Sequence, residues 1–420
     1  MKRLPKRSRQ RALQRLEILT ATLVVMLILV CGTLVVIPIV SPAAGAATAD
    51  IIRSVVGPQP VAHMESVSAW MKDTLYRAVS LVIAVRPAIS WSGGMGPAPR
   101  PLTGTPEQRA TVTSQPTTPS GSAGAEPAPV PTIAIGATSL PPVDVVTAFP
   151  QIGWQAYGPQ PVDGPLMAST LIMVDPQRSY AGVALVRMDL TQLQLHLMAG
   201  FIEPAHPSGI SQRIPDLGMV PAVDQRRLIA AFNGGFKAVH GHFGMMLDGL
   251  TLLSPIDGMG TIAIYDGGSV GMGVWGSGIK ATSDMIAFRQ NCPPLIQNGQ
   301  LNPALATNAA RAWGITNNTD VTWRTGLGLT QDGRYLIYAV GNGTDARFLG
   351  MALQEAGAYN AMQLDINQYY AHFVTYGSVV NTTGSGDRLQ AQRLLDQMTD
   401  VSNLYLTPYA RDFFYLTLRP

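Results

Sequence analysis

Short apolar runs and alternating apolar and polar positions fill the chain after residue 143, as is typical of β-strands. Turn sequences such as Asp266-Gly267-Gly268 and Gln331-Asp332-Gly333 separate pairs of these runs, which indicates β-hairpins. The pattern predicts strands over residues 171–174, 183–190, 192–198, 228–232, 244–248, 250–254, 261–265, 269–275, 326–330, 334–340, 361–365, 372–376 and 413–418.

Helical spacing is rarer in this part of the chain. It predicts helices over residues 346–356 and 388–398, and Gly357 follows the first at a position where glycine commonly ends a helix. The first part of this region is predicted to contain only strands, and the later part contains both strands and helices. This order favours an α+β or α/β domain over residues 143–420, with a single large mixed β-sheet and few flanking helices.

The longest apolar run covers residues 18–40. Its 23 residues carry no charge, so a helix there could cross a hydrocarbon core of about 30 Å. Residues 1–17 contain seven cations and one anion, and this basic tail predicts a cytoplasmic N-terminus. We therefore expect a single-pass anchor at the cell membrane, in contact with lipid through residues 18–40, and an extracytoplasmic C-terminal domain. Five alanines between residues 43 and 49 leave cleavage after this segment open.

Two segments separate the predicted anchor from the domain. Residues 41–91 form a juxtamembrane stalk, in which residues 62–85 are expected to be an amphipathic helix lying on the membrane or against a partner. Residues 92–142 are rich in Pro, Gly, Ser and Thr, with 11 prolines after residue 96. They can bury too little apolar surface to offset their ordering entropy, so we predict a disordered linker that holds the domain away from the bilayer.

Charge is sparse and unevenly distributed. Only 13% of the residues are charged, and the net charge of +3 comes from the N-terminal tail. From residue 143 onward, 16 Lys and Arg face 20 Asp and Glu, and this acidic balance argues against a nucleic-acid partner. Cys31 lies in the apolar run and Cys292 in the domain, so we expect no disulfide and a small buried thiol at Cys292, with a reactive role as the alternative.

The first candidate for chemistry follows the run at 228–232, which ends in Asn233-Gly234-Gly235-Phe236-Lys237. Glycines after a buried strand let the backbone approach a ligand closely, although a plain crossover is also possible. His240 and His242 follow at strand spacing, but two histidines without a third ligand are a weak zinc signal. We therefore expect no metal. The sequence also contains no phosphate-binding loop or dinucleotide motif, so we expect no cofactor.

Further motifs follow in order: Asp248-Gly249, then Pro294-Leu295-Ile296-Gln297-Asn298-Gly299, then Arg324-Thr325-Gly326, then Leu364-Asp365. This set, within residues 214–376, resembles the phosphodiester glycosidase family, in which the last motif is Leu-Asp-Gly-Gly-Gly-Ser. The present chain continues instead with Ile366, Asn367 and Gln368. Side chains in place of glycines should reshape or partly close a site where backbone amides would contact phosphate or sugar.

The resemblance implies hydrolysis of a sugar-1-phosphodiester, or a related envelope glycan, at the anomeric carbon. Such a reaction needs a carboxylate that stabilises an oxocarbenium-like state or activates water, and cationic contacts for the phosphate. Asp365 is the first candidate for the carboxylate and Asp248 the second, although both also suit turns. Arg324 could hold the phosphate in a fork, with a surface or internal salt bridge as the alternative. The residues expected to bind substrate are Asn233, Gly234, Gly235, Lys237, His240, Arg324, Asn342 and Asn367. The alternative function is a catalytically inactive glycan-binding or envelope scaffold domain of the same fold.

Overall fold

The computed structural model describes residues 42–82, 100–101, 153–159, 165–178, 180–207, 209–306, 311–314, 321–379, 388–400 and 402–420. The predicted basic tail and membrane anchor, and nearly all of the predicted linker, lie outside these ranges, as does Cys31. Among the described residues, no helix is both long and apolar enough to cross a bilayer.

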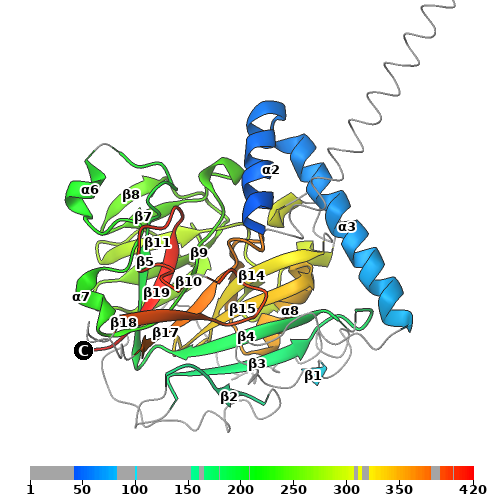
Figure 1. The fold of residues 1–420 in the computed structure, drawn as a ribbon. Helices are drawn as coiled ribbons and strands as arrows, with labels where there is room; N and C mark the ends of the chain where they lie inside the picture. Colours follow the sequence, from blue (N-terminus) through cyan, green and yellow to red (C-terminus); the bar gives the residue numbers. More distant parts are fainter. Residues whose placement is uncertain are drawn as a thin grey trace, which may run out of the picture.

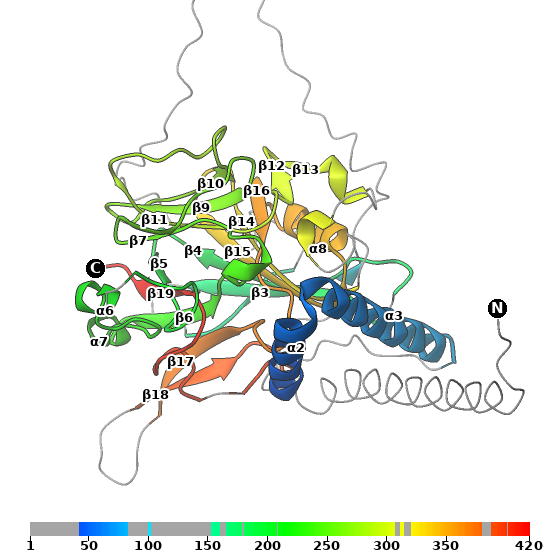
Figure 2. The same cartoon turned by 90° about the horizontal axis from the view of Figure 1, so that it is seen from above.

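The described residues of the domain form three β-sheets. Figures 1 and 2 show how the strands are arranged in space. The nine-stranded sheet has the order β1-β3-β4-β15-β14-β16-β12-β13, with β2 paired to β3. Its strands are β1 (Arg100–Pro101), β2 (Gln155–Ala156), β3 (Met167–Met173), β4 (Gly182–Asp189), β12 (Ile296–Gln297), β13 (Gln300–Leu301), β14 (Thr322–Leu329), β15 (Tyr335–Thr344) and β16 (Asn360–Gln363).

The other two sheets have five strands each. One has the order β18-β17-β6-β19-β5, from β5 (Leu193–Met198), β6 (Leu228–Asn233), β17 (Phe373–Val379), β18 (Arg388–Arg393) and β19 (Phe413–Leu418). The other has the order β10-β9-β11-β7-β8, from β7 (Met245–Leu247), β8 (Leu250–Leu253), β9 (Gly260–Tyr265), β10 (Val270–Val274) and β11 (Met285–Gln290). The prediction of a single large sheet is therefore wrong. Open sheets of more than about ten strands usually divide into packed sheets.

Helix α8 (Ala346–Glu355) connects β15 to β16 across one face of the nine-stranded sheet. Asp345 caps its N-terminus by accepting a hydrogen bond from the Phe348 N–H at 2.8 Å, and Gly357 follows it with a left-handed φ of 93°. Both β15 and β16 are antiparallel to β14, so they run parallel to each other around it. The strands, with few helices, make a large mixed α+β domain, in which β1·β3 is the parallel ladder among the described strands.

Strand β15 shows how the core is divided. Leu336, Tyr338 and Val340 belong to the core shared with the sheet of β5, β6, β17 and β19. Ile337 and Ala339 belong to the core beneath α8. Because successive side chains of a strand point to opposite faces, a nearly continuous apolar run fills both layers.

Most of the predicted strands are present, with ends shifted by a few residues, and α8 confirms the helix expected over residues 346–356. The helix expected over residues 388–398 is wrong, because its first part forms β18 and pairs with β17. Leu389 and Ala391 pack toward the core from this strand. Cross-strand hydrogen bonds and this burial outweigh a weak local preference for helix. Cys292 is buried as a free thiol, as expected.

Two helices precede the domain: α2 (Pro42–Val56) and α3 (Pro58–Val82). The latter confirms the helix expected over residues 62–85. Figures 1 and 2 show α3 running along one edge of the domain, with α2 before it. The short helices are α6 (Ile210–Arg213) and α7 (Ala222–Gln225), and 3₁₀ turns span Ala238–His240, Pro303–Ala306 and Arg311–Trp313.

Candidate functional site

Segments from distant parts of the chain meet around Asn233, at the end of β6. The Asn233 amide donates to Thr325 Oγ1 at 3.0 Å, and the Thr325 hydroxyl donates to the Asp365 backbone oxygen at 2.6 Å. The amide oxygen accepts from the His372 N–H at 3.2 Å and lies 3.0 Å from the Tyr338 hydroxyl. Asn233 is buried, so its hydrogen bonds hold the Asp365 segment in place within the protein.

The two glycines after Asn233 admit a carboxylate of the protein itself. A Cβ atom on Gly234 would lie 1.9 Å from Asp412 Oδ2, and one on Gly235 would lie 2.9 Å from Arg289 Cζ. The N–H of Gly235 donates to Asp412 Oδ2 at 3.0 Å. The close approach predicted for this turn is therefore made to a buried ion pair.

Two buried ion pairs flank this turn. Arg411 Nη2 donates to Asp365 Oδ2 at 2.7 Å and to the Gly235 carbonyl at 2.8 Å. Arg289 Nε donates to Asp412 Oδ2 at 2.8 Å. Burial opposes the charge of Arg411, but the carboxylates of Asp365 and Asp412 outweigh it and hold the pKa of Arg411 above its ordinary value. Asp365 is thus a buried carboxylate adjacent to the glycine turn.

Tyr370 lies between two cations at this place. Its ring centroid is 4.3 Å from the Arg411 guanidinium and 5.5 Å from Lys237 Nζ, which are cation–π distances. Lys237 Nζ also contacts Asp50 Oδ2 of α2 at 2.5 Å. Together, Asp365, Arg411, Lys237 and Tyr370 form what we call the Asp365 cluster. It combines a carboxylate with two cations. Cations of this kind bind phosphate oxygens, and the carboxylate is a group that could act on an adjacent sugar.

The loop after Asp365 has a defined structure without the family's glycines. Asp365 Oδ1 accepts the Asn367 N–H at 2.9 Å, and Asn367 Oδ1 accepts the Tyr369 N–H at 2.9 Å. These are two consecutive Asx turns. Ile366 packs against the core beneath α8. Asn367 therefore shapes the loop that carries Tyr370.

Arg324 lies on the other face of the sheet from its neighbour Thr325, because successive side chains of β14 alternate. It is fully buried, and its Nη1 donates to the Trp313 carbonyl at 2.9 Å and to Gln363 Oε1 at 2.6 Å. These contacts are hydrogen bonds to a backbone carbonyl and a side-chain amide inside the domain, so they connect Arg324 to β16 and to the 3₁₀ turn at Arg311–Trp313. Asn342 pairs with Trp323 in the β14–β15 ladder and is half-buried.

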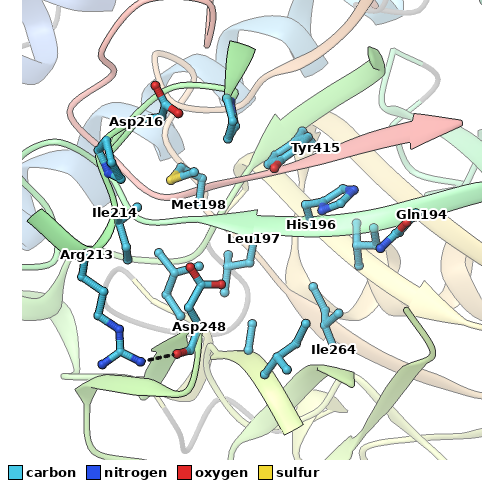
Figure 3. Close-up of a pocket in the computed structure, with 16 residues that line it drawn as sticks. Gln194, His196, Leu197, Met198, Arg213, Ile214, Asp216, Asp248, Ile264 and Tyr415 are labelled. Atoms are coloured by element: carbon cyan, nitrogen blue, oxygen red, sulfur yellow. Dashed lines mark hydrogen bonds between the residues drawn. The ribbon is translucent and has the colours of Figure 1, made fainter. Parts of the chain in front are cut away.

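Asp248 lies in a different part of the domain. Asp248 and Gly249 have φ values of 48° and 70° and form the tight turn between β7 and β8. Figure 3 shows Asp248 in a cleft of about 220 Å³ with His196 and Tyr415, where Arg213 donates to the Asp248 carbonyl at 2.7 Å. This cleft shares no lining residue with the Asp365 cluster. The structure therefore places the two predicted carboxylates apart.

His240 ends the 3₁₀ turn after Lys237 and is exposed, with its ring edge-on to Phe236 at 6.4 Å. His242 follows in a left-handed conformation. Within the described ranges, no three His, Cys, Asp or Glu side chains are grouped so that they could hold a metal ion.

Sequence reasoning missed Arg411, Asp412, Arg289 and Tyr370. A signal was present in Arg411-Asp412, two adjacent opposite charges directly before the apolar run at 413–418 of a charge-poor chain. In an extended segment their side chains reach opposite sides, so each requires its own partner in the interior.

Residues 226–389 match the family model of phosphodiester glycosidases, whereas no curated protein matches the chain significantly.

Three solved structures are similar at low identity. The zebrafish N-acetylglucosamine-1-phosphodiester α-N-acetylglucosaminidase catalytic domain, auto-inhibited by pro-peptide, is 14% identical, with a TM-score of 0.39 over 64% of this chain and 88% of that chain. A hypothetical protein from Synechocystis is 11% identical, with a TM-score of 0.32 over 60% of this chain and 62% of that chain. A putative exported protein from Burkholderia pseudomallei K96243 is 10% identical, with a TM-score of 0.27 over 59% of this chain and 75% of that chain. The family match alone shows that residues 226–389 resemble the phosphodiester glycosidases, as the ordered motifs of the sequence indicate.

Proposed function

We propose that this protein is a membrane-anchored, extracytoplasmic enzyme that hydrolyses a sugar-1-phosphodiester or a related envelope glycan. The family match over residues 226–389 supports a glycosidase-like activity in general. The observation that carries the specific proposal is the Asp365 cluster, in which a buried carboxylate lies 2.7 Å from the Arg411 guanidinium.

Asp365 takes the role of the reacting carboxylate. Each of its oxygens accepts one hydrogen bond, from Arg411 or from the Asn367 N–H, and each keeps a lone pair. An ionised carboxylate held in this way stabilises positive charge at the anomeric carbon or accepts a proton from the attacking water.

Lys237 and Arg411 take the role of the phosphate contacts. Arg411 Nε is buried and has no hydrogen-bond partner among the described residues. An anionic oxygen that accepted from it would satisfy this donor. The phosphodiester oxygen leaves the sugar with the bonding electron pair, and nearby cations stabilise that developing charge.

A specific observation also favours the second candidate, a catalytically inactive glycan-binding domain. Ile366 and Asn367 occupy positions where the resembling family has glycines, and both have structural contacts in this loop. A loop built in this way offers fewer free backbone amides to a phosphate.

The experiment compares the full chain with its Asp365→Asn variant in detergent, and measures sugar release from synthetic sugar-1-phosphodiesters. The enzyme hypothesis predicts turnover that falls by about 10²–10⁴-fold in the variant. Asp400→Asn, at an exposed carboxylate, is the matched control and should keep full activity. Saturable binding without turnover by the unmodified chain would support the inactive domain instead.

A further inference from the structure

The two N-terminal helices carry an unusual share of the exposed apolar surface. Of the 14 large hydrophobic residues exposed in the described ranges, nine lie on α2 and α3. On α3 they include Val67, Met71, Leu75 and Val79, and Leu75 is 64% exposed. On α2, Val55 is 79% exposed. Single exposed apolar residues are ordinary, but a concentration on two consecutive helices indicates a surface that binds something apolar.

The side of α3 that contacts the domain is polar. Arg178, between β3 and β4, donates to the Asp73 carboxylate at 2.7 and 2.8 Å. The Tyr180 hydroxyl donates to the same carboxylate, and the Tyr180 ring stacks on Tyr76 at 5.5 Å. The amphipathic helix thus places its charged face against the protein and its apolar face outward.

Helix geometry places the aliphatic side chains of α3 and the Asp73 carboxylate on opposite sides of the helix. Residues spaced by four lie on one side of an α-helix, so Val67, Met71, Leu75 and Val79 form a single stripe. At about 100° per residue this stripe is centred on the side opposite Asp73. Trp70 is 65% exposed and lies about 120° around the helix from the centre of the stripe, between the stripe and Asp73. We call the exposed apolar side chains of α2 and α3 the helical apolar face.

We propose that the helical apolar face lies in the surface layer of a lipid bilayer, as a second membrane contact. The uncharged run at residues 18–40 ends two residues before α2 begins at Pro42, so a spanning anchor would deliver α2 directly at the bilayer surface. An exposed Trp on a helix that carries an aliphatic stripe is typical of membrane interfaces. This inference rests on the membrane anchor of the proposed function and does not depend on its catalytic part.

The contacts of α2 and α3 with the domain would also determine its position relative to the membrane. Asp73 of α3 binds Arg178 at the edge of the nine-stranded sheet, and Asp50 of α2 binds Lys237 in the Asp365 cluster. A membrane-bound helical face would therefore hold the Asp365 cluster at a set distance from the lipid. The domain would lie at the bilayer, in contrast to the distant position that a long linker suggests.

Spin labels on the full chain, reconstituted in vesicles of phosphatidylcholine and phosphatidylglycerol, test the proposal. Cys31→Ser removes one native thiol, and Cys292 is fully buried, so a label attaches at the introduced cysteine. Leu75→Cys places the label on the stripe. Val223→Cys, on α7, is the matched control because Val223 is 82% exposed and lies on another surface.

Bilayer contact predicts a label at residue 75 that collides several-fold more often with dissolved oxygen than with a water-soluble nickel complex, relative to the label at residue 223. Equal accessibility at the two positions would overturn the proposal. Spin–spin broadening at residue 75 that disappears on dilution with unlabelled chain would also overturn it, because a second copy of the chain would then cover the face.

Discussion

At the scale of single residues, Gly234 is required because Asp412 occupies the space where a side chain would begin. A Cβ atom there would lie 1.9 Å from Asp412 Oδ2. Gly234→Ala should therefore lower the free energy of unfolding by about 1–3 kcal/mol, measured by urea denaturation followed by circular dichroism. Gly377→Ala is the control, because nothing lies within 4 Å of a Cβ at that position, and it should change stability by less than about 0.5 kcal/mol. Equal losses in the two variants would show that this packing argument is wrong.

Lys237 is a second residue whose environment makes a prediction. Its ammonium group contacts Asp50 at 2.5 Å, so an anionic substrate must compete with this carboxylate. If the proposed function holds, Asp50→Asn should lower KM by roughly two- to tenfold, or about 0.4–1.4 kcal/mol, with kcat little changed. Asp257→Asn, at an exposed carboxylate, should leave both constants unchanged. A KM that rises in Asp50→Asn would mean that Asp50 orders Lys237 for binding.

At the scale of elements, the segment entering β19 joins two sheets through its charges. Asp412 is buried against Arg289, and Asp412→Asn would leave the guanidinium without a compensating charge. The free energy of unfolding should fall by about 3–5 kcal/mol. The pair of half-buried Arg393 and exposed Asp400, 3.6 Å apart, is the control, and Asp400→Asn should cost less than about 1 kcal/mol. The double variant Arg289→Met/Asp412→Leu should recover part of the loss, and no recovery would argue against an electrostatic cause.

A feature of this structure could be predicted when the residues that determine it lie close together in the sequence. Strands such as β14 and β15 carry their apolar pattern within ten residues, so they were predictable. The motifs also drew attention to Asn233 and Asp365, which the structure links through the Thr325 hydroxyl. The partners of these segments were not predictable, because Arg411 lies 46 residues from Asp365 and Asp412 lies 123 residues from Arg289. The helix predicted over residues 388–398 was wrong for a related reason, because the conformation of β18 is set by its pairing with β17.

At the scale of the whole molecule, a charge-poor domain places several of its few charges inside. Arg187, Arg289 and Arg324 are among the largest fully buried side chains, and Arg411 is 5% exposed. Each buried cation adds a repulsive field for any further positive charge in the interior. The fold should therefore tolerate protonation of buried groups poorly.

His372 makes this sensitivity measurable. Burial, with the neighbouring charge of Arg411, lowers the pKa of His372 to about 4, whereas an unfolded histidine titrates near 6.5. Between these values the unfolded chain binds one more proton at this histidine, so the contribution of His372 to stability is full above about pH 6.5 and falls by about 1.4 kcal/mol per pH unit toward pH 4. Urea denaturation at a series of pH values should show this loss in the unmodified chain.

His372→Phe keeps an aromatic ring between Tyr405 and Tyr409 and removes the titrating group. Its stability should depend less on pH between 6.5 and 4, by roughly 3 kcal/mol over the whole interval. His242→Asn, at an exposed histidine, should keep the pH dependence of the unmodified chain. If His372→Phe also keeps it, the acid sensitivity belongs to other groups, and the buried positive charges do not act through His372.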